Sequence, residues 1–235
     1  MVEFQKIRES VQQTSAVIVQ ALPSTIKLIG SPYKFHAQHP RKKRPRSSAL
    51  CGVLVSISLA WMYYINVKSV SEVNASLLDF VTFGAVINFL HLVAIGLIYA
   101  GAGKMILKRV HAITYIENVF FAAVLLPFIA FLAQPVANAQ LEAIVADPSN
   151  FHFGYRTLFN QAAGHSLPVR WGEVLIGIAY LYFAYIVYAG LTGAKQVSRW
   201  RALLTVVVGT AGMFVYQALC ILPVTQVFVH AMTRG

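Results

Sequence analysis

Five apolar stretches, each close to 20 residues long or longer, dominate this sequence of 235 residues. A helix needs about 20 mostly apolar residues to cross the hydrocarbon core of a bilayer. Only 11% of the residues are charged, whereas a soluble domain carries about a quarter. We therefore expect an all-α integral membrane protein with five transmembrane helices, at 49–67, 80–102, 115–134, 173–194 and 202–229.

Lysine and arginine are distributed unevenly over the segments that join these stretches. The N-terminal segment and the second-to-third and fourth-to-fifth connections lie on one side of the membrane and hold fifteen of the nineteen Lys and Arg residues. Cytoplasmic segments of membrane proteins carry an excess of Lys and Arg. The bias therefore predicts a cytoplasmic N-terminus and a C-terminus on the outer side, and an odd number of spans agrees with it.

This arrangement predicts a basic cytoplasmic segment at 1–48 and a membrane domain at 49–230 with an outer loop at 135–172. The densest positive charge lies directly before the first span, at Arg41, Lys42, Lys43, Arg44 and Arg46. One interpretation is an orientation anchor. The other is a contact for an acidic protein partner or for anionic lipid, where each basic residue contributes about 1 kcal/mol. Nucleic acid is not an expected partner, because five spans follow.

Three polar residues, Asn88, His91 and Glu117, form a candidate intramembrane site, because polar groups are costly in hydrocarbon. Asn88 and His91 lie on one face of the second predicted span, where hydrogen bonds between helices are the alternative explanation. Glu117 has an alternative as well, since Thr114 and Glu117 have the spacing of a capping box at a helix start. Tyr216 and Gln217 form a second polar spot in the fifth predicted span.

Small residues recur at every fourth position of the first predicted span, at Ser48, Gly52, Ser56 and Ala60. Such a stripe lets two helix backbones approach closely, either within one chain or between copies in an oligomer. The two cysteines, Cys51 and Cys220, lie in apolar runs and are expected to be small buried hydrophobic residues without a disulfide between them.

Catalytic signatures are missing from the sequence. It has no short motif typical of serine hydrolases, zinc proteases or nucleotide-binding enzymes. It also has no pair of intramembrane histidines of the kind that would hold haem. We therefore expect a protein that is not an enzyme and that binds no cofactor and no metal.

The order of these features resembles the Yip-domain family, the Rab-GTPase-interacting membrane proteins and their bacterial relatives. The likeness rests on a proline–aromatic element at 31–35 (SPYKF), five closely spaced apolar stretches and the hairpin at 181–209, in which a short basic turn ends in Arg201-Ala202. The Asp-Leu-Tyr-Gly-Pro element of the eukaryotic members is absent, which points to the prokaryotic branch. The resemblance implies a scaffold or adaptor in the bacterial cytoplasmic membrane that acts through partners.

Two other classes of function remain open at this stage. A small transporter or channel subunit would use Asn88, His91 and Glu117 along its pathway. An assembly subunit of a larger membrane complex would use the small-residue stripe to contact its neighbours.

Overall fold

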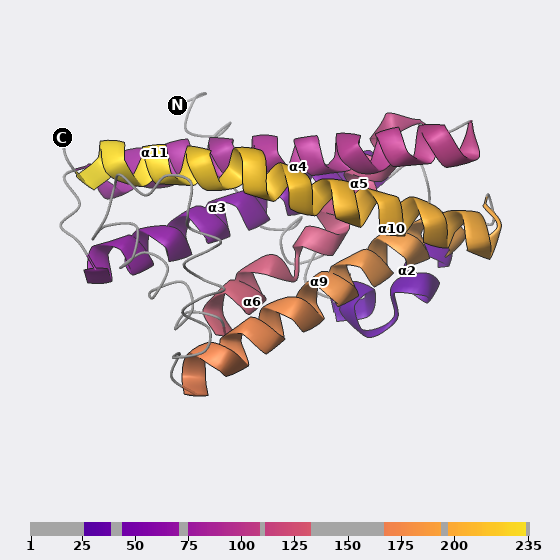
Figure 1. The fold of residues 1–235 in the computed structure, drawn as a ribbon, viewed down its shortest axis with the longest axis horizontal. Coiled ribbons are helices and arrows are strands. Elements are labelled where there is room, and N and C mark those ends of the chain that lie inside the picture. The colour runs from indigo at the N-terminus through magenta and orange to yellow at the C-terminus, as the bar shows by residue number, and fades with distance from the viewer. Residues whose placement is uncertain are drawn as a thin grey trace, which may run out of the picture.

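The structure is a computed structural model, and it describes residues 26–38, 44–70, 75–108, 111–132, 167–193 and 197–233. Every regular element in these residues is a helix. The helices form a single bundle, in which some lie along the long axis of the molecule and others run obliquely to it (Figure 1). The expectation of an all-α fold is confirmed for the described part of the chain.

Four of the helices are long and apolar enough to cross a membrane, namely the segments Ser47–Ser69, Leu77–Leu107, Val174–Gly193 and Arg199–Thr225. They belong to α3 (Arg44–Val70), α4 (Leu77–Leu107), α9 (Leu167–Gly193) and α10 (Arg199–Tyr216). The last of these continues into η2 (Gln217–Ile221) and α11 (Leu222–Thr233). Each helix begins before the corresponding predicted span. The outer loop predicted at 135–172 therefore ends earlier than expected, because residues 167–172 already belong to α9.

The third predicted span, 115–134, is not one continuous helix. It consists of α5 (Ala112–Ala123) and α6 (Leu126–Leu132), with a turn between them. Pro127 explains the break, because proline has no N–H for the carbonyl of Ala123 and its ring clashes with that carbonyl. The chain tightens there instead: Val124 N donates to Phe121 O (3.4 Å) and Leu125 N to Ala122 O (3.3 Å).

The fifth predicted span is continuous but changes its helix type before Pro223. α10 passes into a π-helical turn, η2 (Gln217–Ile221), and then into α11 (Leu222–Thr233). Pro223 would clash with the carbonyl four residues earlier in a regular α-helix, and a π-turn is one way to relieve such a clash. The irregularity next to Pro223 is thus a π-turn on the N-terminal side of the proline.

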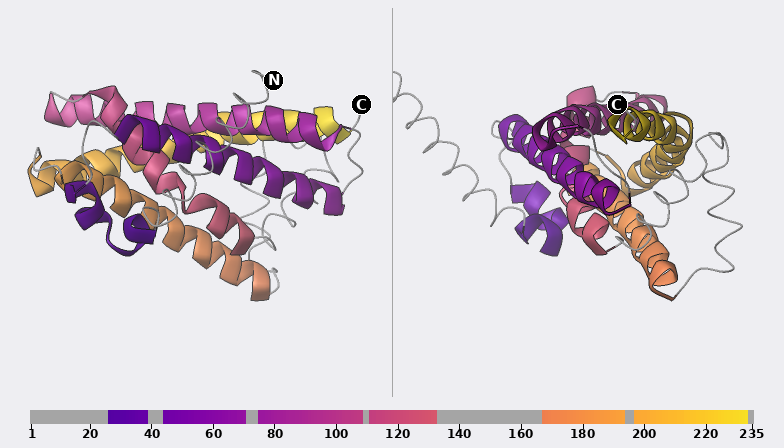
Figure 2. Two further views of the ribbon diagram at one scale, coloured as in Figure 1. Left: turned by 180° about the vertical axis from the view of Figure 1, so that it is seen from behind. Right: turned by 90° about the vertical axis from the view of Figure 1, so that its left-hand side faces the viewer.

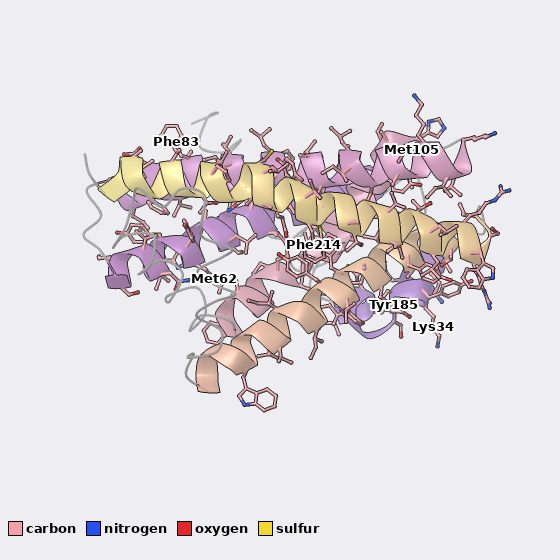
Figure 3. All side chains as sticks on the ribbon, viewed as in Figure 1. Lys34, Met62, Phe83, Met105, Tyr185 and Phe214 are labelled. Atoms are coloured by element: carbon pink, nitrogen blue, oxygen red, sulfur yellow. The ribbon has the colours of Figure 1, made fainter. Side chains whose placement is uncertain are left out.

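The helices pack around α4 and α5. α4 contacts α3, α5 and α10, while α5 contacts α3, α4 and α9 (Figure 2). The core between them is rich in aromatic side chains that are almost fully buried, among them Tyr99, Tyr115, Phe120, Phe121 and Phe183. Aliphatic and aromatic side chains also cover the outside of the bundle. Phe83 and Met105 of α4, for example, are 58% and 70% exposed and point away from the bundle (Figure 3).

Part of the predicted cytoplasmic segment belongs to this bundle. Residues 26–30 are helical and lead into α2 (Pro32–Gln38), which packs against α9. Leu28, Phe35 and His36 are 1%, 6% and 1% exposed. The Phe35 ring meets the Phe121 ring edge to face, with centroids 5.3 Å apart. The segment 26–38 is therefore fixed to the end of the bundle where α3 and α10 begin and α4 ends (Figure 1).

Candidate functional site

The two polar spots expected in the second and fifth predicted spans meet in the structure. His91 lies on α4, and Tyr216 is the last residue of α10 before the π-turn. The Nδ1 atom of His91 lies 2.8 Å from the hydroxyl of Tyr216, within hydrogen-bonding distance. The two rings meet edge to face, with centroids 5.8 Å apart. A polar contact thus joins α4 to α10 in the apolar part of the bundle.

The π-turn carries a second polar contact, to a different helix. Gln217, its first residue, donates from Nε2 to the hydroxyl of Tyr180 on α9 at 2.9 Å. The Tyr180 ring also packs edge to face on Phe214, with centroids 5.3 Å apart. Neighbouring residues 216 and 217 therefore reach α4 and α9 respectively, and the start of the π-turn is attached on both sides.

Asn88 makes a third contact, in another direction. Its Nδ2 donates to the backbone carbonyl of Ser56 on α3 at 3.3 Å. The hydroxyl of Ser56 in turn donates to the carbonyl of Gly52 at 2.7 Å. Asn88 and His91 are close on α4, yet they connect it to α3 and to α10. Hydrogen bonds between membrane helices of this kind contribute about 0.6 kcal/mol each on average.

The second ring nitrogen of His91 is not used in these contacts. This atom, Nε2, is buried and forms no hydrogen bond within the described residues. If Tyr216 donates to Nδ1, Nε2 carries the proton and is a donor; in the other tautomer, Nε2 is an acceptor. A buried polar atom without a partner costs free energy, so this atom is the place in the site where a water molecule, a solute or a proton would bind. π-turns within α-helices occur frequently at functional sites.

Glu117 does not close a capping box. α5 begins at Ala112, with His111 as its N-cap residue and no side-chain cap bond, and Thr114 lies inside the helix. The N–H of Thr114 donates to the carbonyl of His111 at 3.0 Å. Glu117 therefore lies in the second turn of α5 and is partly buried. The capping interpretation is wrong because α5 begins at Ala112, two residues before Thr114, so that Thr114 cannot be the N-cap residue.

All four residues of the small-residue stripe are buried. Ser48, Ser56 and Ala60 are each 1% exposed. A Cβ on Gly52 would lie 2.9 Å from the ring of Phe120, and one on Gly84 of α4 would lie 3.0 Å from the Cβ of Ala60. The stripe is therefore covered by α4 and α5 of the same chain, and it offers little surface for contact with another copy.

The basic run lies only partly in the described chain. Arg41, Lys42 and Lys43 are outside the described residues, while Arg44 and Arg46 belong to the first turn of α3. The helix segment 26–38 ends at Gln38 and α3 begins at Arg44, so the chain around the run is attached to the bundle at both ends.

The structure also adds polar residues that the sequence did not single out. The hydroxyl of Tyr99 on α4 lies 2.8 Å from that of Thr210 on α10. Asn118 is 1% exposed, next to Gly190 of α9, and its Nδ2 forms no hydrogen bond within the described residues. The sequence could have indicated Asn118, because it is a polar residue within an apolar run. Both cysteines are free thiols; Cys51 is partly buried, but Cys220 is exposed, contrary to expectation.

In the described part of the chain, no three His, Cys, Asp or Glu side chains gather closely enough to hold a metal ion. No family model, curated protein or solved structure matches this chain. Its function is therefore inferred from its own residues.

Proposed function

We propose that the chain is a scaffold or adaptor of the Yip-domain type in the cytoplasmic membrane of a bacterium, and that it acts through membrane or protein partners without catalysis. In this proposal the chain crosses the membrane five times, with its N-terminus in the cytoplasm and its C-terminus outside. Four long helices supply four spans. α5 and α6, with 12 and 7 residues, supply the fifth together.

The distribution of charge supports the orientation. Lys104 and Lys108 at the end of α4 and Arg199 and Arg201 at the start of α10 are exposed, and both helix ends lie at the same end of the bundle as α2 (Figure 1). Lys34 of α2 projects away from the bundle at that end (Figure 3). By the positive-inside rule, this end faces the cytoplasm.

The attachment of α2 is the observation that carries the proposal. α2 packs against α9 through buried side chains, and α3 begins six residues after α2 ends. The described elements on either side of the run, α2 and α3, thus both belong to the bundle. A dense run of positive charge between these two elements, next to the first span, is suited to anionic headgroups or to an acidic surface of a partner.

The test replaces Arg41, Lys42, Lys43, Arg44 and Arg46 with Gln in the full chain. The variant and the parent are reconstituted into nanodiscs that contain phosphatidylglycerol and phosphatidylcholine, and retained lipids are counted by native mass spectrometry. Proteins crosslinked to each in cells are identified in parallel. We expect the variant to insert normally but to lose anionic lipid or a crosslinked partner. A matched control neutralises Lys104, Lys108, Arg199 and Arg201. If the first variant retains the same anionic lipid and the same crosslinked proteins as the parent, the basic run serves only to orient the chain in the membrane.

A small transporter or channel subunit is the second candidate function, and the free Nε2 of His91 beside the π-turn favours it. It predicts flux of ions or small solutes in reconstituted vesicles, lost in H91A. The control is T210V, which removes a different hydrogen bond between α4 and α10. Absence of flux in the parent would leave the scaffold proposal, and copurification of stoichiometric partners would point to an assembly subunit.

A further inference from the structure

The helical segment 26–38 has a surface that its contacts with the bundle do not use. Ser31 N donates to Lys27 O (2.9 Å) and Phe35 N to Ser31 O (3.0 Å), so helical hydrogen bonding continues across the interruption at Ser31 and Pro32. With about 100° of rotation per residue, its side chains fall into three groups whose centres lie roughly 120° apart. Each group has a distinct chemical character.

The first side faces the bundle and is formed by Leu28, Pro32, Phe35 and His36, all buried. The backbone is tied to α9 on this side as well. The hydroxyl of Tyr182 donates to the carbonyl of Ile29, and a Cβ on Gly193 would lie 3.3 Å from the carbonyl of Tyr33. The segment therefore follows the C-terminal half of α9, and these contacts fix the direction of its other two sides.

The second side is apolar and exposed. It consists of Ile26, Ile29 and Tyr33, which are 68%, 37% and 46% exposed and have the spacing i, i+3, i+7 of one helix face. The half of α9 that the segment follows also exposes apolar side chains, Leu181 at 74% and Tyr185 at 46%. The exposed apolar surface thus continues from the proposed lipid-facing side of α9 onto the segment.

The third side is polar and basic. Lys27, Ser31, Lys34 and Gln38 occupy it, and all four are exposed. Two lysines beside an apolar face, at the basic end of a membrane bundle, form the pattern of a helix that lies in the bilayer interface. Their long stems allow the ammonium groups to reach lipid phosphates while the helix remains at the depth of the acyl chains.

We infer that residues 26–38 form an interfacial helix, with Ile26, Ile29 and Tyr33 in the acyl chains of the cytoplasmic leaflet and with Lys27 and Lys34 at the phosphates of anionic lipids. The inference rests on the membrane placement given under Proposed function. The occupant of the apolar side is the bilayer, because this side continues the lipid-facing surface of α9 and is bordered by lysines that match anionic headgroups.

The experiment measures the depth of single side chains in the full-length chain. Cys51 and Cys220 are replaced by Ala, and single cysteines at 26, 29 and 33, or at 31 and 38 as polar-side controls, carry a nitroxide label. Each protein is reconstituted into bilayers of phosphatidylcholine and phosphatidylglycerol. Collisions with oxygen, which partitions into lipid, are compared with collisions with a water-soluble nickel chelate. We expect labels at 26, 29 and 33 to meet mainly oxygen and labels at 31 and 38 to meet mainly nickel.

Nickel accessibility at 26, 29 and 33 equal to that at 31 and 38 would overturn the inference. So would spin–spin broadening at 29, which would show a second copy on this side. A label at Leu181 separates the two proposals. If Leu181 meets oxygen and Ile29 does not, the interfacial helix fails and the membrane placement stands; if Leu181 meets nickel, the membrane placement itself fails.

The contribution of Lys27 and Lys34 is measured separately, as a preference for anionic lipid. In bilayers with spin-labelled phosphatidylglycerol, the variant with K27Q and K34Q should retain at most half of the parent's preference for this lipid over phosphatidylcholine. The variant with S31A and Q38A is the control and should keep the full preference. An unchanged preference in the lysine variant would remove the headgroup contact from the inference.

Discussion

The close approach of α4 and α5 depends on Gly96, a residue that no motif marks as special. A Cβ at this position would lie 2.7 Å from the Cα of Ile116, a backbone atom that cannot rotate away. Gly101 lies on the same helix, and a Cβ there would meet nothing within 4 Å. Two glycines five residues apart in one helix therefore have opposite structural roles.

We expect G96A to lower the free energy of unfolding by about 1–3 kcal/mol, the usual cost of inserting a methyl group into a packed interior. G101A should leave it unchanged or raise it by up to about 1 kcal/mol, since Ala is the better helix former. Reversible unfolding in mixed micelles measures both. Equal effects of the two substitutions would show that α4 and α5 do not approach each other at Gly96.

Two prolines, Pro127 and Pro223, lie at or next to irregular turns of the bundle helices. Pro127 separates α5 from α6 and leaves the carbonyl of Ala123 without its usual helical donor, whereas Pro223 follows a π-turn and leaves its helix continuous. The two sites also differ in their surroundings, because residues 216 and 217 before Pro223 form hydrogen bonds with α4 and α9.

P127A should join α5 and α6 into one helix. Residue 127 gains an N–H, which can donate to the carbonyl of Ala123 and complete the regular pattern. Amide hydrogen exchange measures this directly: we expect slower exchange at Val124 and Leu125 in the variant than in the parent, and a protected amide at residue 127 of the variant. Exchange at Val124 and Leu125 as fast as in the parent would mean that the neighbouring helices, and not the proline, impose the turn.

At the scale of the whole molecule, the segment 112–132 decides the topology. If α5 and α6 cross the membrane together, position 150 and the C-terminus both lie outside; if they stay on the cytoplasmic side, both lie inside. We expect alkaline phosphatase fused after residue 150 or after Gly235 to be active, and green fluorescent protein at the same positions to be dark. Fusions after residue 196 should show the reverse. A fluorescent C-terminal fusion would contradict five spans.

The sequence by itself determined that this chain is helical, that its apolar runs are long enough for a bilayer, and that its positive charge is concentrated on one set of connections. These properties depend on the composition and length of single segments, and they require no knowledge of which segments are in contact. It also indicated the separate polarity of His91 and Tyr216, but not that they meet, because residues 125 positions apart are brought together only by the packing of α4 on α10.

The tertiary structure alone decided how the small residues and the N-terminal segment are used. Whether the stripe from Ser48 to Ala60 faces its own chain or another copy depends on which helix lies opposite, and α4 and α5 occupy that place. The helical spacing of 26–38 is compatible with a free surface helix, but the contact with α9 buries Leu28 and Phe35 and leaves Ile26 and Tyr33 exposed. The physical reason is the same in both cases: the pattern of a helix defines its faces, and only its neighbours determine which face is covered.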